Sequence, residues 1–134
     1  MGFRIEWADE NHLIMNAYVE APWTWDQYTA AVDSMFAVIR LQDHPCGLTI
    51  DISRMGSFPK GDVLSSLIRM EKSMPDNVFA SALVGAPYAA MVFLDVVFRI
   101  RPRGRRRAMF VRTMPEAHQK IKERYQQQFA AAVK

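Results

Sequence analysis

The chain contains 134 residues, half of them hydrophobic, and carries a formal net charge of +3. A chain of this length suits one domain with a single hydrophobic core. Its one cysteine, Cys46, excludes an internal disulfide and has no companion at the spacing of a zinc site. We therefore expect a cytoplasmic protein with no metal or other cofactor, in which Cys46 is a small buried residue at the start of a strand.

Neither a signal peptide nor a membrane span is expected. Arg4 and Glu6 carry charge where a signal peptide requires an apolar region. The longest apolar run, residues 89–98, is interrupted by Asp95 and is far shorter than the roughly 20 residues that cross a bilayer. These features predict a soluble protein.

The first elements are predicted to be two strands. Phe3, Ile5 and Trp7 alternate with charged residues, as in a strand with one buried face. Turn-forming residues at 8–11 separate this strand from a second extended stretch over residues 12–20. We expect the two strands to form an antiparallel hairpin at the edge of a sheet.

A capping box predicts the start of the first helix. Thr24 is followed three residues later by Gln27, so each side chain can bond the backbone N–H of the other residue. Trp23 and Tyr28 stand at the positions of a hydrophobic staple. Apolar residues then recur at helical spacing as far as Ile39, which predicts a helix with one buried face.

Strands and helices alternate through the rest of the chain. Residues 47–53 are rich in aliphatic side chains, which predicts a central strand covered on both faces. The later predicted elements are a helix over 63–74, a strand over 78–84, an apolar helix over 87–98, a strand over 108–112, and a helix from a second capping box at Thr113 to Phe129. This order, ββαβαβαβα, predicts an α/β domain with a mixed sheet of about five strands, the later ones parallel, flanked by helices.

The element order and the segment Leu-Thr-Ile-Asp-Ile-Ser at 48–53 resemble the STAS domain family, which includes anti-sigma factor antagonists and the related STAS/Sec14-like domains of bacteria. In that family a strand ending in an Asp-hydrophobic-Ser pattern leads to a loop and helix that carry a phosphorylatable serine. Asp51, Ile52 and Ser53 match the first part of this pattern. The resemblance implies a single STAS-like domain, residues 1–134, that binds a protein partner or a small apolar ligand.

The chain departs from the family where the switch serine is expected. Residues 58–62 read Phe-Pro-Lys-Gly-Asp and contain no serine. Ser57 lies upstream of this segment, and Ser65 and Ser66 fall inside the predicted helix. A phosphorylation switch is therefore not carried over to this chain.

The carboxyl end of the central strand is the expected working surface, because open α/β sheets bind ligands beyond the carboxyl ends of their strands. The candidate interaction or ligand loop consists of Asp51, Ser53, Met55, Ser57, Phe58 and Lys60. In the alternative to a protein partner, a small apolar or lipid-like molecule binds between the sheet and this loop, against Met55, Phe58 and Met74.

The sequence offers little for catalysis, and we predict no catalytic residues and no enzyme activity. His12, His44 and His118 are widely separated and lack the spacing of metal ligands, so we expect surface or turn roles for them. Asp51 and Asp62 could pair for acid–base chemistry. The favoured alternative is structural, with Asp51 accepting from loop amides and Asp62 at the start of a helix.

Six arginines within nine positions form a basic cluster: Arg99, Arg101, Arg103, Arg105, Arg106 and Arg107. Pro102 and Gly104 predict a turn there, and no aromatic residue is interleaved that could stack on bases. We favour a solvated loop that complements the end of the preceding helix. An acidic protein or membrane surface is one alternative, and nucleic acid is less favoured.

The helix before the basic cluster is the candidate association helix, defined by Tyr88, Met91, Val92, Asp95 and Phe98. A helix that is apolar nearly all round is either deeply buried or paired with another chain. Asp95 is expected to pair with Arg99, four residues later. The leading hypothesis is a non-enzymatic domain that acts by protein association, as a homodimer.

Overall fold

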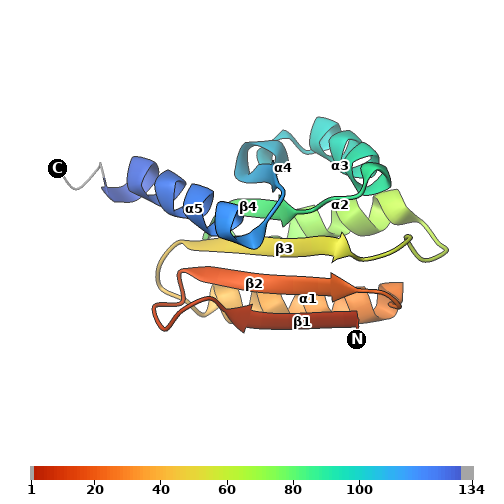
Figure 1. Ribbon diagram of the computed structural model, residues 1–134, viewed down its shortest axis with the longest axis horizontal. Coiled ribbons are helices and arrows are strands. Elements are labelled where there is room, and N and C mark those ends of the chain that lie inside the picture. The colour runs from red at the N-terminus through yellow and green to blue at the C-terminus, as the bar shows by residue number, and fades with distance from the viewer. Residues whose placement is uncertain (1, 131–134) are drawn as a thin grey trace.

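The computed structural model describes residues 2–130 and contains one five-stranded sheet with helices on both faces (Figure 1). The α/β class and the mixed sheet predicted from the sequence are confirmed. The elements in chain order are β1 (Gly2–Trp7), β2 (Ile14–Glu20), α1 (Trp25–Arg40), β3 (Cys46–Arg54), α2 (Val63–Ser73), β4 (Val78–Val84), α3 (Tyr88–Ile100), α4 (Pro102–Arg107), β5 (Ala108–Val111), α5 (Met114–Tyr125) and the π-helical turn η1 (Gln126–Ala130).

The strands lie in the order β1-β2-β3-β4-β5, so β3 is the central strand and β1 and β5 are the two edges. β1 pairs with β2 in antiparallel fashion, with Phe3 opposite Val19, which confirms the predicted edge hairpin. The pairs β2–β3, β3–β4 and β4–β5 are parallel. Each parallel step after β3 is bridged by helical connections, as crossovers between parallel strands require.

The predicted capping box begins α1. The Thr24 hydroxyl accepts from the Gln27 backbone N–H at 3.1 Å, and Gln27 Oε1 accepts from the Thr24 backbone N–H at 3.0 Å. The second box forms only in part: the Thr113 hydroxyl accepts from the Glu116 N–H at 3.3 Å, but Glu116 Oε1 accepts from the N–H of Arg112 instead. Both helices begin at the predicted signals because one orphan amide of the first turn is satisfied by the cap.

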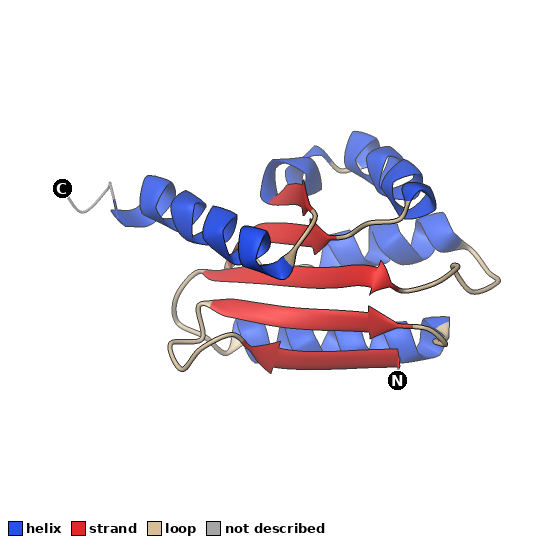
Figure 2. Cartoon of the chain, viewed as in Figure 1, coloured by secondary structure: helices blue, strands red, loops and turns tan. Residues whose placement is uncertain are grey.

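The two faces of the sheet are covered unequally. α1 and α2 lie behind the sheet in the view of Figure 2, with α3 above them, and the three helices enclose a large core that includes Phe36, Leu48 and Ile50. On the other face α5 packs against β3, β4 and β5, with Ile121 buried in a second, smaller cluster. α5 also reaches the start of β2, where Ile14 belongs to this cluster. Within residues 2–130, no helix lies over β1 or over the carboxyl ends of β2 and β3 on this face, so the prediction that β3 is covered on both faces holds only for its first half.

The structure differs from the predicted elements in three places. β2 begins at Ile14 rather than at residue 12, because His12 adopts a positive φ of 54° and belongs to the turn. The regular α-helix at the end stops at Tyr125, and η1 continues it past Phe129. The basic cluster begins in α3 with Arg99, and its residues from 102 to 107 form the short helix α4 rather than a loop, which adds one element to the predicted order. Within residues 2–130, no helix has the length and apolar character needed to cross a membrane.

Candidate functional site

The alternation of side chains along β3 divides the predicted loop residues between the two faces of the sheet. Asp51 and Ser53 lie on the face that carries α5, whereas Ile52 and then Met55 are buried on the face of α1–α3. Ser57 and Lys60 are exposed on the loop itself. The residues predicted to form one loop site therefore belong to two different sites on opposite faces of the sheet.

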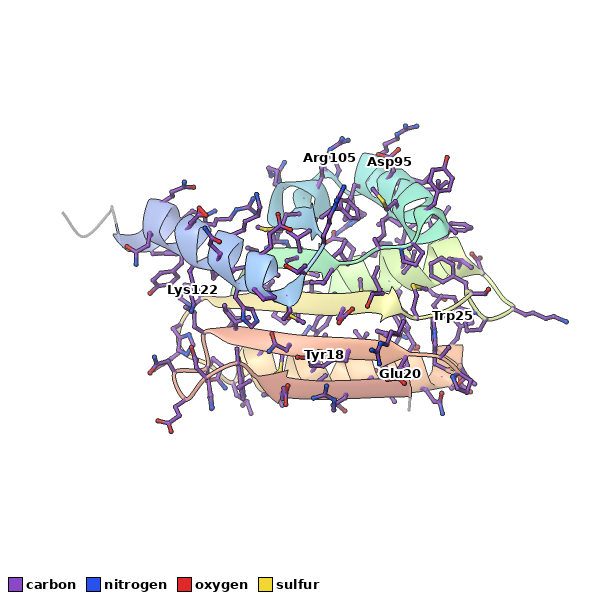
Figure 3. All side chains as sticks on the ribbon, viewed as in Figure 1. Tyr18, Glu20, Trp25, Asp95, Arg105 and Lys122 are labelled. Atoms are coloured by element: carbon purple, nitrogen blue, oxygen red, sulfur yellow. The ribbon has the colours of Figure 1, made fainter. Side chains whose placement is uncertain are left out.

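The first of these sites is a polar groove of about 370 Å³ on the uncovered half of the sheet. Its polar lining comes from β1, β2 and the end of β3 and consists of Arg4, Tyr18, Glu20, Asp51, Ser53 and Arg54. Figure 3 labels two of these residues, Tyr18 and Glu20. The Arg4 guanidinium stands 4.0 Å above the Tyr18 ring. Asp51 Oδ1 accepts from the backbone N–H of Ser53 at 3.0 Å and from its hydroxyl at 2.7 Å.

Asp62 has an equally local role as the N-cap of α2. Its carboxylate accepts from the Ser65 backbone N–H at 3.0 Å and from the Ser65 hydroxyl at 2.7 Å. These hydrogen bonds, the backbone one first, hold the pKa of Asp62 below its ordinary value. Within residues 2–130 no hydrogen bond joins Asp51 to Asp62, and each carboxylate is engaged by a serine that follows it, as the structural alternative predicts.

The second site is an apolar cavity of about 60 Å³ on the face of α1–α3. Its wall is made of apolar and aromatic side chains, among them Trp23, Tyr28, Met55, Phe58, Met70 and Leu94. The predicted pocket residues Met55 and Phe58 are thus part of one cavity wall. Met74 was wrongly placed there, because it lines a smaller neighbouring cavity of about 20 Å³.

Residues 55–61 form a cap over this cavity, and two indole groups hold the cap in place. Trp23 Nε1 donates to the Met55 carbonyl at 2.8 Å, and Trp25 Nε1 donates to the Pro59 carbonyl at 3.2 Å. The Phe58 ring stacks on Trp25 with a centroid separation of 6.0 Å. Figure 3 shows Trp25 at this end of the molecule.

Tyr28 is part of the cavity wall, although the sequence predicted only that it packs at the start of the first helix. Its hydroxyl oxygen is buried and has no hydrogen-bond partner within residues 2–130. Burial raises the pKa of Tyr28 above its ordinary value, so the phenol stays protonated and remains a donor. A buried hydroxyl without a partner is costly, which makes this an unusual feature of the site.

The basic cluster is mostly engaged within the chain. Glu71, on α2, is only 3% exposed and accepts from Arg101 Nε at 3.1 Å and from Arg107 Nη2 at 2.5 Å. Arg103 pairs with Asp76 at 2.5 Å, and Arg99 pairs with Asp95 at 2.8 Å as predicted. The prediction of a loop was wrong, because the segment forms α4 and the buried Arg107–Glu71 pair fixes it to α2. Arg103, Arg105 and Arg106 are exposed, as the prediction of a solvated segment requires.

Glu71 is a second residue that sequence reasoning missed, although a signal was present. It stands four residues after Leu67 and three before Met74, on the apolar stripe of α2. An acidic residue at such a position needs a buried cationic partner, and the basic cluster supplied candidates. Gly104 lets α4 come close, since a Cβ there would lie 2.8 Å from Glu71 Cγ.

The predicted association helix borders a surface groove of about 630 Å³ that runs between α3, α4 and β5. Met91, Val92, Asp95 and Phe98 line the groove, as do Arg105 and Phe110, which the sequence did not single out for this role. Tyr88, the remaining predicted residue, is not among its lining residues and is 83% exposed on α3. In Figure 3, Asp95 and Arg105 lie along the same margin of the molecule.

A buried polar contact under α5 corrects the expectation of a surface or turn role for His118. Asn16 Oδ1 accepts from the Thr49 hydroxyl at 2.6 Å and lies 2.8 Å from His118 Nε2. Burial, with a smaller contribution from Lys122, lowers the pKa of His118 below its ordinary value. The neutral imidazole can therefore donate through Nε2 and help to dock α5 on the sheet.

Cys46 is buried at the start of β3, as predicted, although His44 Nδ1 lies 3.8 Å from its sulfur. Burial raises the pKa of the Cys46 thiol to about 11, so the histidine does not make it a thiolate. We expect an aromatic disulfide reagent at pH 8 to modify the native protein at least about a hundredfold more slowly than the protein unfolded in guanidinium. Comparable rates in the two states would contradict the buried position.

The fold defines a single α/β domain whose mixed sheet carries α1–α3 on one face and α5 on part of the other. Comparisons with protein-family models, curated proteins and solved structures find no match to this chain. Within residues 2–130, no three His, Cys, Asp or Glu side chains gather where they could hold a metal ion.

Proposed function

We propose that this chain is a non-enzymatic association module, STAS-like in its element order, that pairs with a second copy of itself through the groove between α3 and β5. The apolar surface along this helix and edge strand carries the proposal. Among the large hydrophobic side chains exposed within residues 2–130, Tyr88, Met91, Val92 and Phe110 belong to it. Contiguous apolar surface of this kind marks contact sites.

The edge position of β5 supports pairing through the backbone as well. The Val111 carbonyl accepts from the Gly85 N–H at 2.9 Å, so this residue faces β4 and the chain that follows it. Since the direction of the backbone groups alternates along a strand, the N–H and C=O of Phe110 point away from β4. A second β5 can therefore add to this edge and bring its own Phe110 beside the groove.

The charges along the groove suit a surface that meets a copy of itself. A two-fold axis places the same patch on both subunits, so the patch must contain groups of both signs. Asp95 and Arg105 both line the groove, and Arg105 has no acidic partner within residues 2–130. The Asp95–Arg99 pair is exposed and worth little, so Asp95 can turn to Arg105 of a second copy.

Other features agree with this choice of partner. Arg99, Arg101, Arg103 and Arg107 already pair with acidic residues of the chain, which removes most of the charge that nucleic acid would need. The proposal includes no phosphorylation switch, because the hydroxyls of Ser53 and Ser65 donate to the neighbouring Asp51 and Asp62. We place the module in the cytoplasm, for which its buried and unpaired thiol is suited.

Sedimentation velocity tests the association. We expect the native chain to sediment as a dimer and Phe110→Asp to weaken the dimer by more than about tenfold, because a charge replaces an apolar group at the centre of the contact. The matched control is Leu41→Asp, since Leu41 is 83% exposed at the end of α1, away from the groove.

A native chain that stays monomeric up to the highest soluble concentration contradicts the proposal. So does a dimer that Leu41→Asp weakens as much as Phe110→Asp does. Phe110 is 42% and Leu41 83% exposed, so both variants should stay folded, and circular dichroism spectra verify this.

A further inference from the structure

We propose that two copies of the chain pair their β5 strands antiparallel with Phe110 opposite Phe110, so that the two five-stranded sheets join into one. This inference rests on the proposed pairing through α3 and β5 and adds to it the residue that lies on the two-fold axis. Two observations carry it: the hydrogen bonds that already engage the backbone of residues 108–112, and the faces of the sheet on which their side chains lie.

The outer edge of β5 offers few backbone groups to a second strand. Residues 108, 110 and 112 direct their N–H and C=O groups outward, because those of Val111 face β4 and the direction alternates along a strand. However, the Ala108 N–H already donates to a carbonyl of α4, and the Arg112 N–H donates to Glu116 Oε1 at 3.0 Å. Among residues 108–112, Phe110 is therefore the one whose outward N–H and C=O can both serve a second strand.

These backbone groups favour one register. At a hydrogen-bonded site of an antiparallel pair, two opposite residues exchange two N–H···O bonds, so each residue needs both of its groups. When Phe110 lies opposite Phe110, both bonds form and complete the centre of the contact. A shift by two residues places Phe110 opposite Ala108 or Arg112, whose N–H groups are engaged. The Phe110 carbonyl then lacks a donor inside the contact, which is costly.

The side chains of β5 suit the same register on both faces of the sheet. Phe110 lies on the face of α3, where its ring packs against Phe98 with the centroids 6.5 Å apart. Opposite residues of an antiparallel pair carry their side chains on the same face, so the two Phe110 rings meet beside the α3 helices. Met109 and Val111 belong to the cluster on the other face and lie opposite each other across the axis. Both contacts are apolar.

Nuclear Overhauser effects in the native chain test this register without a substitution. Met109 and Val111 of one copy are separated by two residues, about 6.6 Å along a strand, which is too far for a strong effect between their Hα atoms. In the proposed register, Met109 of one copy and Val111 of the other form a non-hydrogen-bonded pair with Cα atoms about 4.5 Å apart. We therefore expect an intermolecular effect between Met109 Hα and Val111 Hα in a mixture of ¹³C-labelled and unlabelled chains.

Two variants serve as controls for this measurement. Phe110→Asp, which should weaken the dimer, should lose the intermolecular effect at the same chain concentration. Leu41→Asp should keep it, because Leu41 is exposed at the end of α1, away from the groove.

The possible failures of the register and of the association are distinguishable. An intermolecular effect that joins Met109 to Met109, or Val111 to Val111, shows a shifted register and overturns the inference while the association stands. A dimer in sedimentation velocity without an intermolecular effect from β5 overturns it in the same way. A native chain that sediments as a monomer overturns the proposed function and this inference with it.

Discussion

Glu71→Gln should lower the free energy of unfolding by about 3–5 kcal/mol, which is the cost of removing one charged partner from a buried ion pair. Glu71 is the acidic partner of both Arg101 and Arg107, and the Arg107 side chain is only 10% exposed. The glutamine retains the size of the side chain but removes its charge, so a guanidinium remains buried without compensation. Equilibrium unfolding in urea measures the difference.

Asp76→Asn is the matched control for this prediction. It breaks the ion pair with Arg103, whose two side chains are largely exposed, and should cost no more than about 1 kcal/mol. If Glu71→Gln and Asp76→Asn have the same small effect, the Glu71 pairs do not anchor α4. Replacing Glu71 and Arg107 together by apolar residues of similar volume should recover much of the loss, because no buried charge is then left alone.

Gly47→Ala should lower the free energy of unfolding by about 1–3 kcal/mol, which is typical of overpacking in a well-filled core. Gly47 lies in β3 directly under α5, and a Cβ at this position would collide with Cγ2 of Ile121. Ile121 is completely buried in the smaller core cluster, so moving it would disturb the packing of its neighbours. The change should push α5 away from the sheet, and urea unfolding monitored by circular dichroism measures the loss.

A double-mutant cycle with Ile121→Ala identifies the cause. The single change Ile121→Ala leaves a cavity and should cost about 2–5 kcal/mol. Because this cavity accepts the new methyl group, the two changes together should cost less than their sum by more than about 0.5 kcal/mol. Strict additivity would show that Gly47 is needed for a reason other than its contact with α5.

Local sequence signals predicted most of the fold, because they act over a few residues. The capping box at Thr24, the alternation in β1 and the apolar run of β4 each specify one element, and each element formed. The helix α4 was missed because its sequence, with Pro102, Gly104 and adjacent arginines, carries no helical pattern of its own. The contact that holds it joins Arg107 to Glu71, which lies 36 residues earlier in the chain.

The candidate site was predicted less well, for a reason that lies in the sheet. Period-two alternation alone places Asp51 and Ile52 on opposite faces, so the sequence contained the signal that the predicted loop residues serve two sites. The packing of Ile121 in α5 over Gly47 in β3, however, joins distant parts of the chain, and alternation does not reveal it. The pairing of Phe110 with α3 in one groove likewise follows from the strand order, which periodicity does not reveal.

The two edges of the sheet differ, and this difference limits how far an assembly could grow. β5 is a four-residue strand with apolar Phe110 exposed, whereas β1 presents Arg4 and Glu6 on its exposed face as an ion pair. Charged side chains on an edge strand discourage pairing with another sheet. Subunits that join through β5 in a two-fold arrangement therefore leave only β1 edges outside. The dimer that we propose would therefore close at two copies and would not extend into a fibre.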